Sequence, residues 1–217
     1  MRELRGTEVV AEDLRRLYLN LIRARRFPVE FRHAFEQYIY KSQQLTETMR
    51  KEFKRLTGEG WTAKDYSGWN VYTDLLKALR NATYHGYPLA LHGCAIAIYK
   101  AEEFSTDQKP LSELNLVRGY RVVKSTFLVE MPFDEAVIGI SAGYPLKHPR
   151  DGKTHSYPLK EFVSYELTWG ILDAGVRSAA EKAGTVDAVK IALHSYPAIK
   201  GYFDYYENRL KKMGMYS

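Results

Sequence analysis

Apolar residues recur every three or four positions over three stretches of the N-terminal half, and this spacing predicts three helices. The first is expected over residues 9–26 and the third begins between residues 66 and 70. The second starts at Pro28, which suits a first helical turn, and stops at Thr57-Gly58-Glu59-Gly60. It carries the longest apolar stripe: Phe31, Phe35, Tyr38, Ser42, Leu45, Met49 and Phe53.

The pattern changes after residue 88, where apolar residues alternate with small or polar ones. This alternation predicts a strand around residues 94–98 and a second over 120–131, which is rich in Val, Thr and Phe. Residues 136–140 are expected to return beside the second strand as a hairpin. The polar stretch 143–158 contains helix and strand breakers such as Pro145, Pro149 and Gly152, and it is expected to form an exposed loop.

The C-terminal part returns to helical spacing. Residues 162–183 are ambiguous because Gly170 and Gly175 weaken a helix there. A short helix over 186–193 has Thr185 as its cap candidate, and Pro197 is expected to break it or start another. A final helix is indicated by the apolar stripe Ile199, Tyr202, Phe203, Tyr206 and Leu210.

These elements predict a mainly α (α+β) fold in a single domain, residues 1–217. A helical core spans 9–88, a β-rich insertion with its exposed loop spans 90–158, and C-terminal helices over 159–217 complete a bundle. The chain is 45% hydrophobic and 27% charged, which is typical of a globular protein.

The charge and the cysteine content indicate which partners and which compartment suit the protein. The formal net charge of +6 favours polyanionic partners. The single cysteine, Cys94, excludes an internal disulfide and fits a reducing compartment. No apolar run approaches the length of a membrane span, and the start of the chain has no export signal. We therefore expect a cytoplasmic protein that does not enter a membrane.

Basic residues gather on the polar side of the first helix. A solvated face is the simplest interpretation, and a stripe that faces phosphates is the alternative, with Arg23 and Arg26 as candidate binding residues. The six histidines form no pair with cysteine or carboxylate at metal-ligand spacing, and no glycine-rich phosphate loop is present. We therefore expect neither a metal ion nor a cofactor.

The most distinctive chemistry lies at the close of the third helix. Arg80, Asn81, Tyr84 and His85 place a guanidinium, an amide, a phenol and an imidazole within about a turn and a half. A guanidinium matches phosphate oxygens, and an imidazole transfers protons near neutral pH. On an ideal helix Arg80 and His85 point about 140° apart. Ordinary surface placement is the competing interpretation of these residues.

The octapeptide over residues 79–86, Leu-Arg-Asn-Ala-Thr-Tyr-His-Gly, resembles the signature of the HEPN family (higher eukaryotes and prokaryotes nucleotide-binding). Arg80, Asn81 and His85 match that signature, and the resemblance covers about residues 9–92. It implies an up-and-down helical bundle that pairs into a two-fold homodimer. The β-rich stretch of about residues 90–141 is not part of the family's minimal bundle and would be a small antiparallel β insertion in it. Active members of the family are metal-independent endoribonucleases, and inactive members bind RNA or serve in assembly.

The resemblance suggests a role for each residue. His85 would act as general base or acid, Arg80 would stabilise the phosphoryl oxygens, and Asn81 would orient the imidazole or the phosphate. Tyr84 is a weaker candidate for stacking or hydrogen bonding. RNA would be cut to a 2′,3′-cyclic phosphate and a 5′-hydroxyl. The alternative is a non-catalytic dimer that binds nucleic acid or a protein partner. A toxin or defence role with an antitoxin follows only by analogy.

Overall fold

The computed structural model describes residues 5–62, 66–84, 89–100, 120–128, 160–167 and 174–215. The chain divides into two compact units rather than the single domain expected from the sequence. The helical unit combines Met1–Leu89 with Leu167–Ser217, and the inserted unit is Ala90–Glu166. The insertion therefore extends beyond the boundary expected at residue 158. The expected hairpin return at 136–140 and loop at 143–158 lie outside the described residues.

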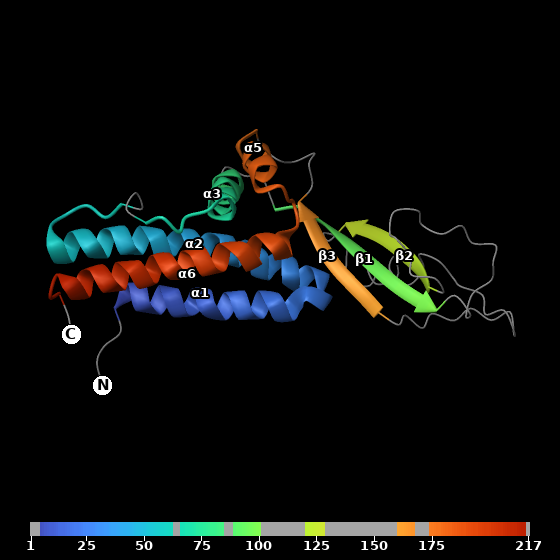
Figure 1. Ribbon diagram of the computed structural model, residues 1–217, viewed down its shortest axis with the longest axis horizontal. Coiled ribbons are helices and arrows are strands. Elements are labelled where there is room, and N and C mark those ends of the chain that lie inside the picture. The colour runs from blue at the N-terminus through green and yellow to red at the C-terminus, as the bar shows by residue number, and fades with distance from the viewer. Residues whose placement is uncertain are drawn as a thin grey trace, which may run out of the picture. The chain divides into compact units, whose positions relative to one another are not determined.

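Three long helices lie side by side in the helical unit: α1 (Gly6–Arg23), α2 (Pro28–Thr57) and α6 (Ala188–Lys212) (Figure 1). A short 3₁₀ turn, η1 (Ala24–Arg26), connects α1 to α2. Figure 1 shows that α1 runs opposite to both α2 and α6. Each of these helices was expected from its apolar stripe. None of the helices within the described ranges is long and apolar enough to span a membrane.

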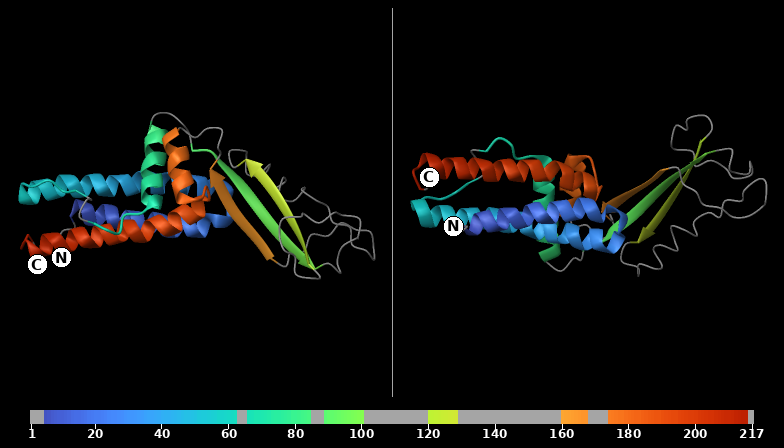
Figure 2. Two further views of the ribbon diagram at one scale, coloured as in Figure 1. Left: turned by 45° about the horizontal axis from the view of Figure 1, so that its top comes forward. Right: turned by 90° about the horizontal axis from the view of Figure 1, so that it is seen from below.

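Two shorter helices lie beside each other across the long ones (Figure 2). They are α3 (Val71–Tyr84), which carries the Arg80 region, and α5 (Ala174–Ala183). The antiparallel pair α1 and α2 has the arrangement of an up-and-down bundle, whereas α3 and α5 cross it. The described part of the chain is thus mainly helical, as the sequence predicts.

The core of the helical unit is the apolar stripe of α2, and all seven of its predicted members are buried. On α6, four of the five stripe residues are also buried, and only Phe203 is partly exposed. The Tyr38 hydroxyl and the Ser195 hydroxyl share a buried hydrogen bond of 2.9 Å that joins α2 to α6. Gly58 ends α2 with a φ of 77°, a left-handed conformation that glycine adopts without strain.

A buried carboxylate fastens the same three helices near the start of α1. Glu52 of α2 accepts hydrogen bonds from the Thr7 hydroxyl at 2.6 Å and from the Tyr206 hydroxyl at 3.0 Å. Arg5, the residue before α1, completes the group through an ion pair with Glu52 at 3.1 Å. Arg5 also pairs with Glu207 of α6. A buried charge needs such partners, because an unpaired one would be strongly destabilising.

The inserted unit contains a three-stranded sheet in the order β2-β1-β3. Its strands are β1 (Leu91–Lys100), β2 (Tyr120–Leu128) and β3 (Lys160–Leu167). β1 and β2 are antiparallel, and β3 also runs opposite to β1 in Figure 1. The register pairs His92 with Leu128 and Lys100 with Tyr120. The strands expected at 94–98 and 120–131 are therefore confirmed.

The expectation that residues 159–217 are helical is wrong at its beginning, because Lys160–Leu167 forms β3. The segment alternates in burial: Tyr165 and Leu167 are buried, whereas Glu166 between them is exposed. This period of two is the signature of a strand. The adjacent apolar residues Phe162 and Val163 interrupt this alternation in the sequence, and the only described helix between 162 and 183 is α5.

The expected break at Pro197 is also wrong, because α6 continues through it from Ala188 to Lys212. Its N-cap is Asp187 rather than Thr185: the Asp187 carboxylate accepts from the amides of Val189 at 2.9 Å and Lys190 at 3.4 Å. Thr185 instead accepts from the Asp187 amide at 3.1 Å. Packing of the apolar stripe beyond Pro197 outweighs the amide that proline lacks.

Replacing Asp187 by alanine is expected to lower the free energy of unfolding by about 1 kcal/mol, because two amides lose their acceptor. Asp187→Asn retains a side-chain oxygen and is expected to lose less than half of that. Urea denaturation followed by circular dichroism measures both. Equal stability of the alanine variant and the parent would contradict the assignment of this cap.

Candidate functional site

The segment before α3 is fixed to α6. The Tyr66 hydroxyl donates to the Ala198 carbonyl at 3.2 Å, and the same hydroxyl lies close to Gly201. A Cβ at Gly201 would overlap that hydroxyl, so the missing side chain leaves room for the tyrosine. The Asn70 side-chain amide adds a second link by donating to the His194 carbonyl at 3.2 Å. Both bonds hold the entry to α3 against the bundle.

Asn70 also caps α3. Its side-chain oxygen accepts from the amides of Tyr72 and Thr73, each at 3.1 Å, which satisfies donors that have no partner within the helix. The helix starts at Val71, one residue after the interval 66–70 expected from the sequence. It then buries Thr73, Leu75, Leu76, Leu79 and Ala82. This choice of buried face leaves Arg80, Asn81 and Tyr84 at the surface.

The last turn of α3 brings the three surface residues together. Nη1 of Arg80 lies 3.4 Å from the Asn81 side-chain oxygen, and the guanidinium carbon lies 4.9 Å from the centre of the Tyr84 ring. The Tyr84 side chain is 68% exposed. A cation over an aromatic face is attracted to it without being neutralised. The guanidinium is therefore held in place while it stays charged.

One acidic residue of α2 approaches the same guanidinium. Oε1 of Glu47 lies 3.5 Å from Nη2 of Arg80, and it also accepts from the side-chain amide of Gln43 at 3.2 Å. The side chains of Arg80 and Glu47 are 27% and 44% exposed. An ion pair this long and this exposed contributes little free energy, so a phosphate can take the place of the carboxylate.

Three of the predicted residues remain, and the structure describes the surroundings of one of them, Arg23. His85 lies outside the described residues, as does the side chain of Arg26. Arg23 is exposed in the last turn of α1, just before α2 begins at Pro28. Glu47 lies 19 residues (47 − 28) further along α2, which is about 28 Å of helix. Arg23 therefore does not belong to the site at the end of α3.

The arginines in the middle of α1 support the interpretation of a solvated face. Glu12 accepts from Arg15 at 2.8 Å and from Arg16 at 3.0 Å. These two hydrogen bonds, with that of Arg15 the larger effect, lower the pKa of the Glu12 carboxyl to about 2. The carboxylate consequently offsets part of the positive charge on this face at any ordinary pH.

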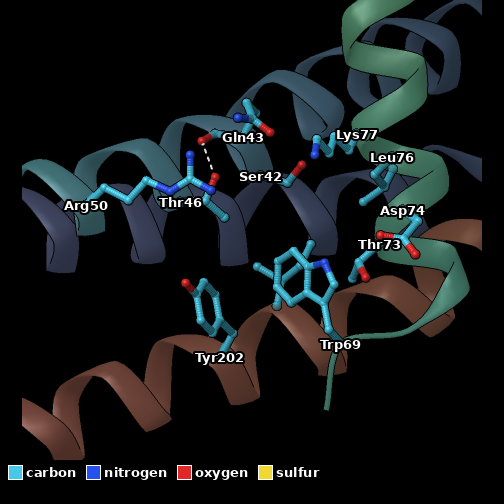
Figure 3. A pocket seen from close by; sticks show the side chains of 11 residues that line it. Ser42, Gln43, Thr46, Arg50, Trp69, Thr73, Asp74, Leu76, Lys77 and Tyr202 are labelled. Atoms are coloured by element: carbon cyan, nitrogen blue, oxygen red, sulfur yellow. Dashed lines mark hydrogen bonds between the residues drawn. The ribbon is translucent and has the colours of Figure 1, made fainter. Parts of the chain in front are cut away.

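A cavity of about 190 Å³ lies between α2, α3 and α6 (Figure 3), and the sequence reasoning missed it. Ile199 and Tyr202 belong to the apolar stripe that predicts the last helix, and this pattern does not reveal that they also line a cavity. Apart from Leu76, its other lining residues are polar, charged or aromatic: Ser42, Gln43, Thr46, Arg50, Trp69, Thr73, Asp74 and Lys77. The spacing Gln43, Thr46, Arg50 on α2 was the available signal, since these positions share one helical face.

Comparisons of the chain with family models, with curated proteins and with solved structures found no match. The resemblance to the HEPN family stays a prediction that depends on Arg80, Asn81 and His85.

Substitutions at Asn70 are expected to separate its two roles. Asn70→Asp retains the capping oxygen and loses the donor to the His194 carbonyl, whereas Asn70→Ala loses both. We expect the alanine variant to lose about 1 kcal/mol or more of unfolding free energy and the aspartate variant to lose less. Hydrogen exchange of the α3 amides checks this: faster exchange in the first turn is expected only for alanine. Identical exchange in both variants would contradict the capping role.

Proposed function

We propose that this protein is a metal-independent endoribonuclease of the HEPN type that acts as a homodimer. The observation that supports it is the cluster at the end of α3, where Arg80 contacts Asn81 and Tyr84 at the surface directly before His85 in the chain. A charged guanidinium held at the surface is suited to a phosphodiester. The single cysteine is compatible with work in the cytoplasm.

In the proposed reaction the phosphoryl group of one RNA linkage is transferred from the 5′-oxygen to the neighbouring 2′-oxygen of the same strand. A base removes the proton of the 2′-hydroxyl, whose oxygen attacks the phosphorus, while an acid protonates the leaving 5′-oxygen. His85 serves as base or acid, and Arg80 stabilises the negative charge that builds on the phosphoryl oxygens. Asn81, in contact with Arg80, orients the phosphate or the imidazole. The products are a 2′,3′-cyclic phosphate and a 5′-hydroxyl.

The homodimer follows from the number of groups that the reaction needs. One chain supplies one imidazole at the motif, whereas acid and base are two roles. A two-fold axis supplies a second copy of each residue at the same interface. It also resolves the divergence of about 140° between Arg80 and His85 on an ideal helix, since Arg80 of one subunit can act with the partner's His85.

A second candidate function is a non-catalytic dimer that binds nucleic acid or a protein partner. The ion pair between Arg80 and Glu47 favours it, because a carboxylate beside the guanidinium opposes an approaching phosphate. In this case Arg80 and His85 would stabilise the interface between subunits. Binding of RNA without cleavage separates this candidate from the first.

Replacing His85 by alanine is expected to slow RNA cleavage by about 100-fold or more, because an acid–base group is lost. A fluorescent RNA cleaved in the presence of EDTA measures the rate. His33→Ala is the matched control, since His33 is exposed on α2 outside the proposed site. Full activity of the His85 variant would overturn the assignment.

The mass in solution is measured on the same samples. Light scattering is expected to give twice the chain mass of 25.1 kDa, about 50 kDa, for parent and variant alike. A monomer that still cleaves RNA would contradict the shared site.

Replacing Glu47 by glutamine is expected to tighten RNA binding about 1.5- to 5-fold, because the substitution removes the anion beside Arg80. Fluorescence anisotropy with an RNA lacking 2′-hydroxyls measures affinity without cleavage. Glu30→Gln makes the same change of charge at the exposed start of α2 and serves as control. An equal effect of both substitutions would show that only net charge matters and that Arg80 is not a phosphate contact.

A further inference from the structure

We propose that the cavity between α2, α3 and α6 binds one nucleoside monophosphate unit, with the base beside Trp69 and the phosphate at Lys77. Either a free nucleotide or one residue of an RNA strand presents this chemistry. Where RNA supplies the unit, the inference rests on the proposed function and adds a base-binding pocket to it.

The size and floor of the cavity suit a single planar ring system. At about 190 Å³ it is smaller than the roughly 300–1,000 Å³ typical of sites for drug-sized ligands. Trp69 lines the cavity, and Figure 3 shows its indole between the Tyr202 ring and the side chains of α3. Trp69 packs edge-on against Tyr202, with ring centres 4.9 Å apart, and is thereby held in one orientation. Bases stack on such aromatic side chains with little preference for sequence.

The charges around the cavity favour an anionic substituent on that ring. Arg50 and Lys77 contribute two cations and Asp74 one anion, and all three side chains are exposed. Burial raises the pKa of the Tyr202 phenol to about 12, although the Trp61 indole and the charge of Arg50 act in the opposite direction. The phenol is therefore neutral at working pH, and the floor of the cavity adds no negative charge.

The cavity also supplies polar groups for a ring edge. The Thr46 hydroxyl donates to the Gln43 carbonyl at 2.8 Å (Figure 3), and its oxygen still has room to accept. The Thr73 hydroxyl is already engaged, because it donates to the Asn70 carbonyl and accepts from the Asn70 backbone amide at 3.1 Å. The Thr46 oxygen is therefore the acceptor that matches an amino or ring N–H donor of a nucleobase. An apolar floor with a few placed polar groups is the usual composition of a ligand site.

The position of the cavity relates it to Arg80. Lys77 and Arg80 are three residues apart on α3, which makes them neighbours on the helix surface about 4.5 Å apart along its axis. On α2, Thr46 lines the cavity and the next residue, Glu47, pairs with Arg80. A nucleotide with its base in the cavity and its phosphate at Lys77 would therefore place the next phosphate of a strand toward Arg80.

Calorimetric titration with adenosine 5′-monophosphate tests the pocket. We expect one site per chain, weaker binding of adenosine, and no comparable binding of inorganic phosphate. Lys77→Gln is expected to weaken the nucleotide about three- to tenfold and to leave adenosine unchanged, because it removes only the phosphate contact. Lys51→Gln, at an exposed position of α2 away from the cavity, is the control. Equal losses in both lysine variants, or no binding of the nucleotide, would overturn the proposal.

Trp69→Leu tests the base contact, with the circular dichroism spectrum as the check on folding. It is expected to weaken adenosine and the nucleotide by the same factor, about fivefold or more. If that variant does not fold, Thr46→Val removes a hydroxyl acceptor at nearly constant volume and is expected to weaken both ligands about two- to fivefold. Unchanged affinity of a folded variant would contradict a base in this cavity.

A competition experiment identifies the source of the nucleotide. A short 2′-O-methyl RNA, which lacks the attacking hydroxyl, is expected to displace adenosine 5′-monophosphate. Displacement supports an RNA residue in the pocket. Binding of the nucleotide without displacement supports a free nucleotide and contradicts the proposed RNA substrate. His85→Ala is expected to retain nucleotide affinity, so failure of the cleavage test and failure of the pocket are distinguishable.

Discussion

Burial of the α2 stripe between α1 and α6 is the constraint on which the helical unit depends. Seven apolar or small residues of one helix, from Phe31 to Phe53, lose their contact with water together, and burying each large side chain contributes about 1.5–3 kcal/mol. The polar bonds of Glu52 and Tyr38 lie within the same interface and fix how the three helices meet. Helix α2 is therefore the element against which the others are aligned.

The candidate site is built on the face of α2 next to the stripe, and Ser42 belongs to both the stripe and the cavity. With its buried face fixed, α2 presents Gln43, Thr46, Glu47 and Arg50 toward α3, because these positions recur at helical spacing. Asn70 and Tyr66 then hold the entry to α3 against α6. The end of α3 thus meets Glu47, and its middle closes a cavity with Thr46. Core packing and surface chemistry are linked through the orientation of one helix.

Much of this fold can be predicted from periodicity, and the exceptions have physical causes. The stripes of α2 and α6 identified their helices because long amphipathic patterns are hard to mistake. The prediction at Pro197 was wrong because tertiary packing outweighed a local helix breaker. Strand β3 was missed because the adjacent apolar residues Phe162 and Val163 interrupt its alternating pattern. Of the candidate site, the contact of Arg80 with Tyr84 was predictable from their spacing of four. The pairing with Glu47 and the cavity at Trp69 were not, because they join residues far apart in the chain.

Gly201 of α6 limits which residues are accepted at two positions, because the space that it leaves is occupied by the side chain of Tyr66. The Tyr66 hydroxyl occupies the space that any larger residue at 201 would need, and it bonds to the backbone of α6. A side chain at position 201 would displace the end of the Tyr66 side chain and break its bond to α6, and a smaller residue at 66 would relieve the overlap. Evolutionary change at one of these positions is therefore expected to favour change at the other.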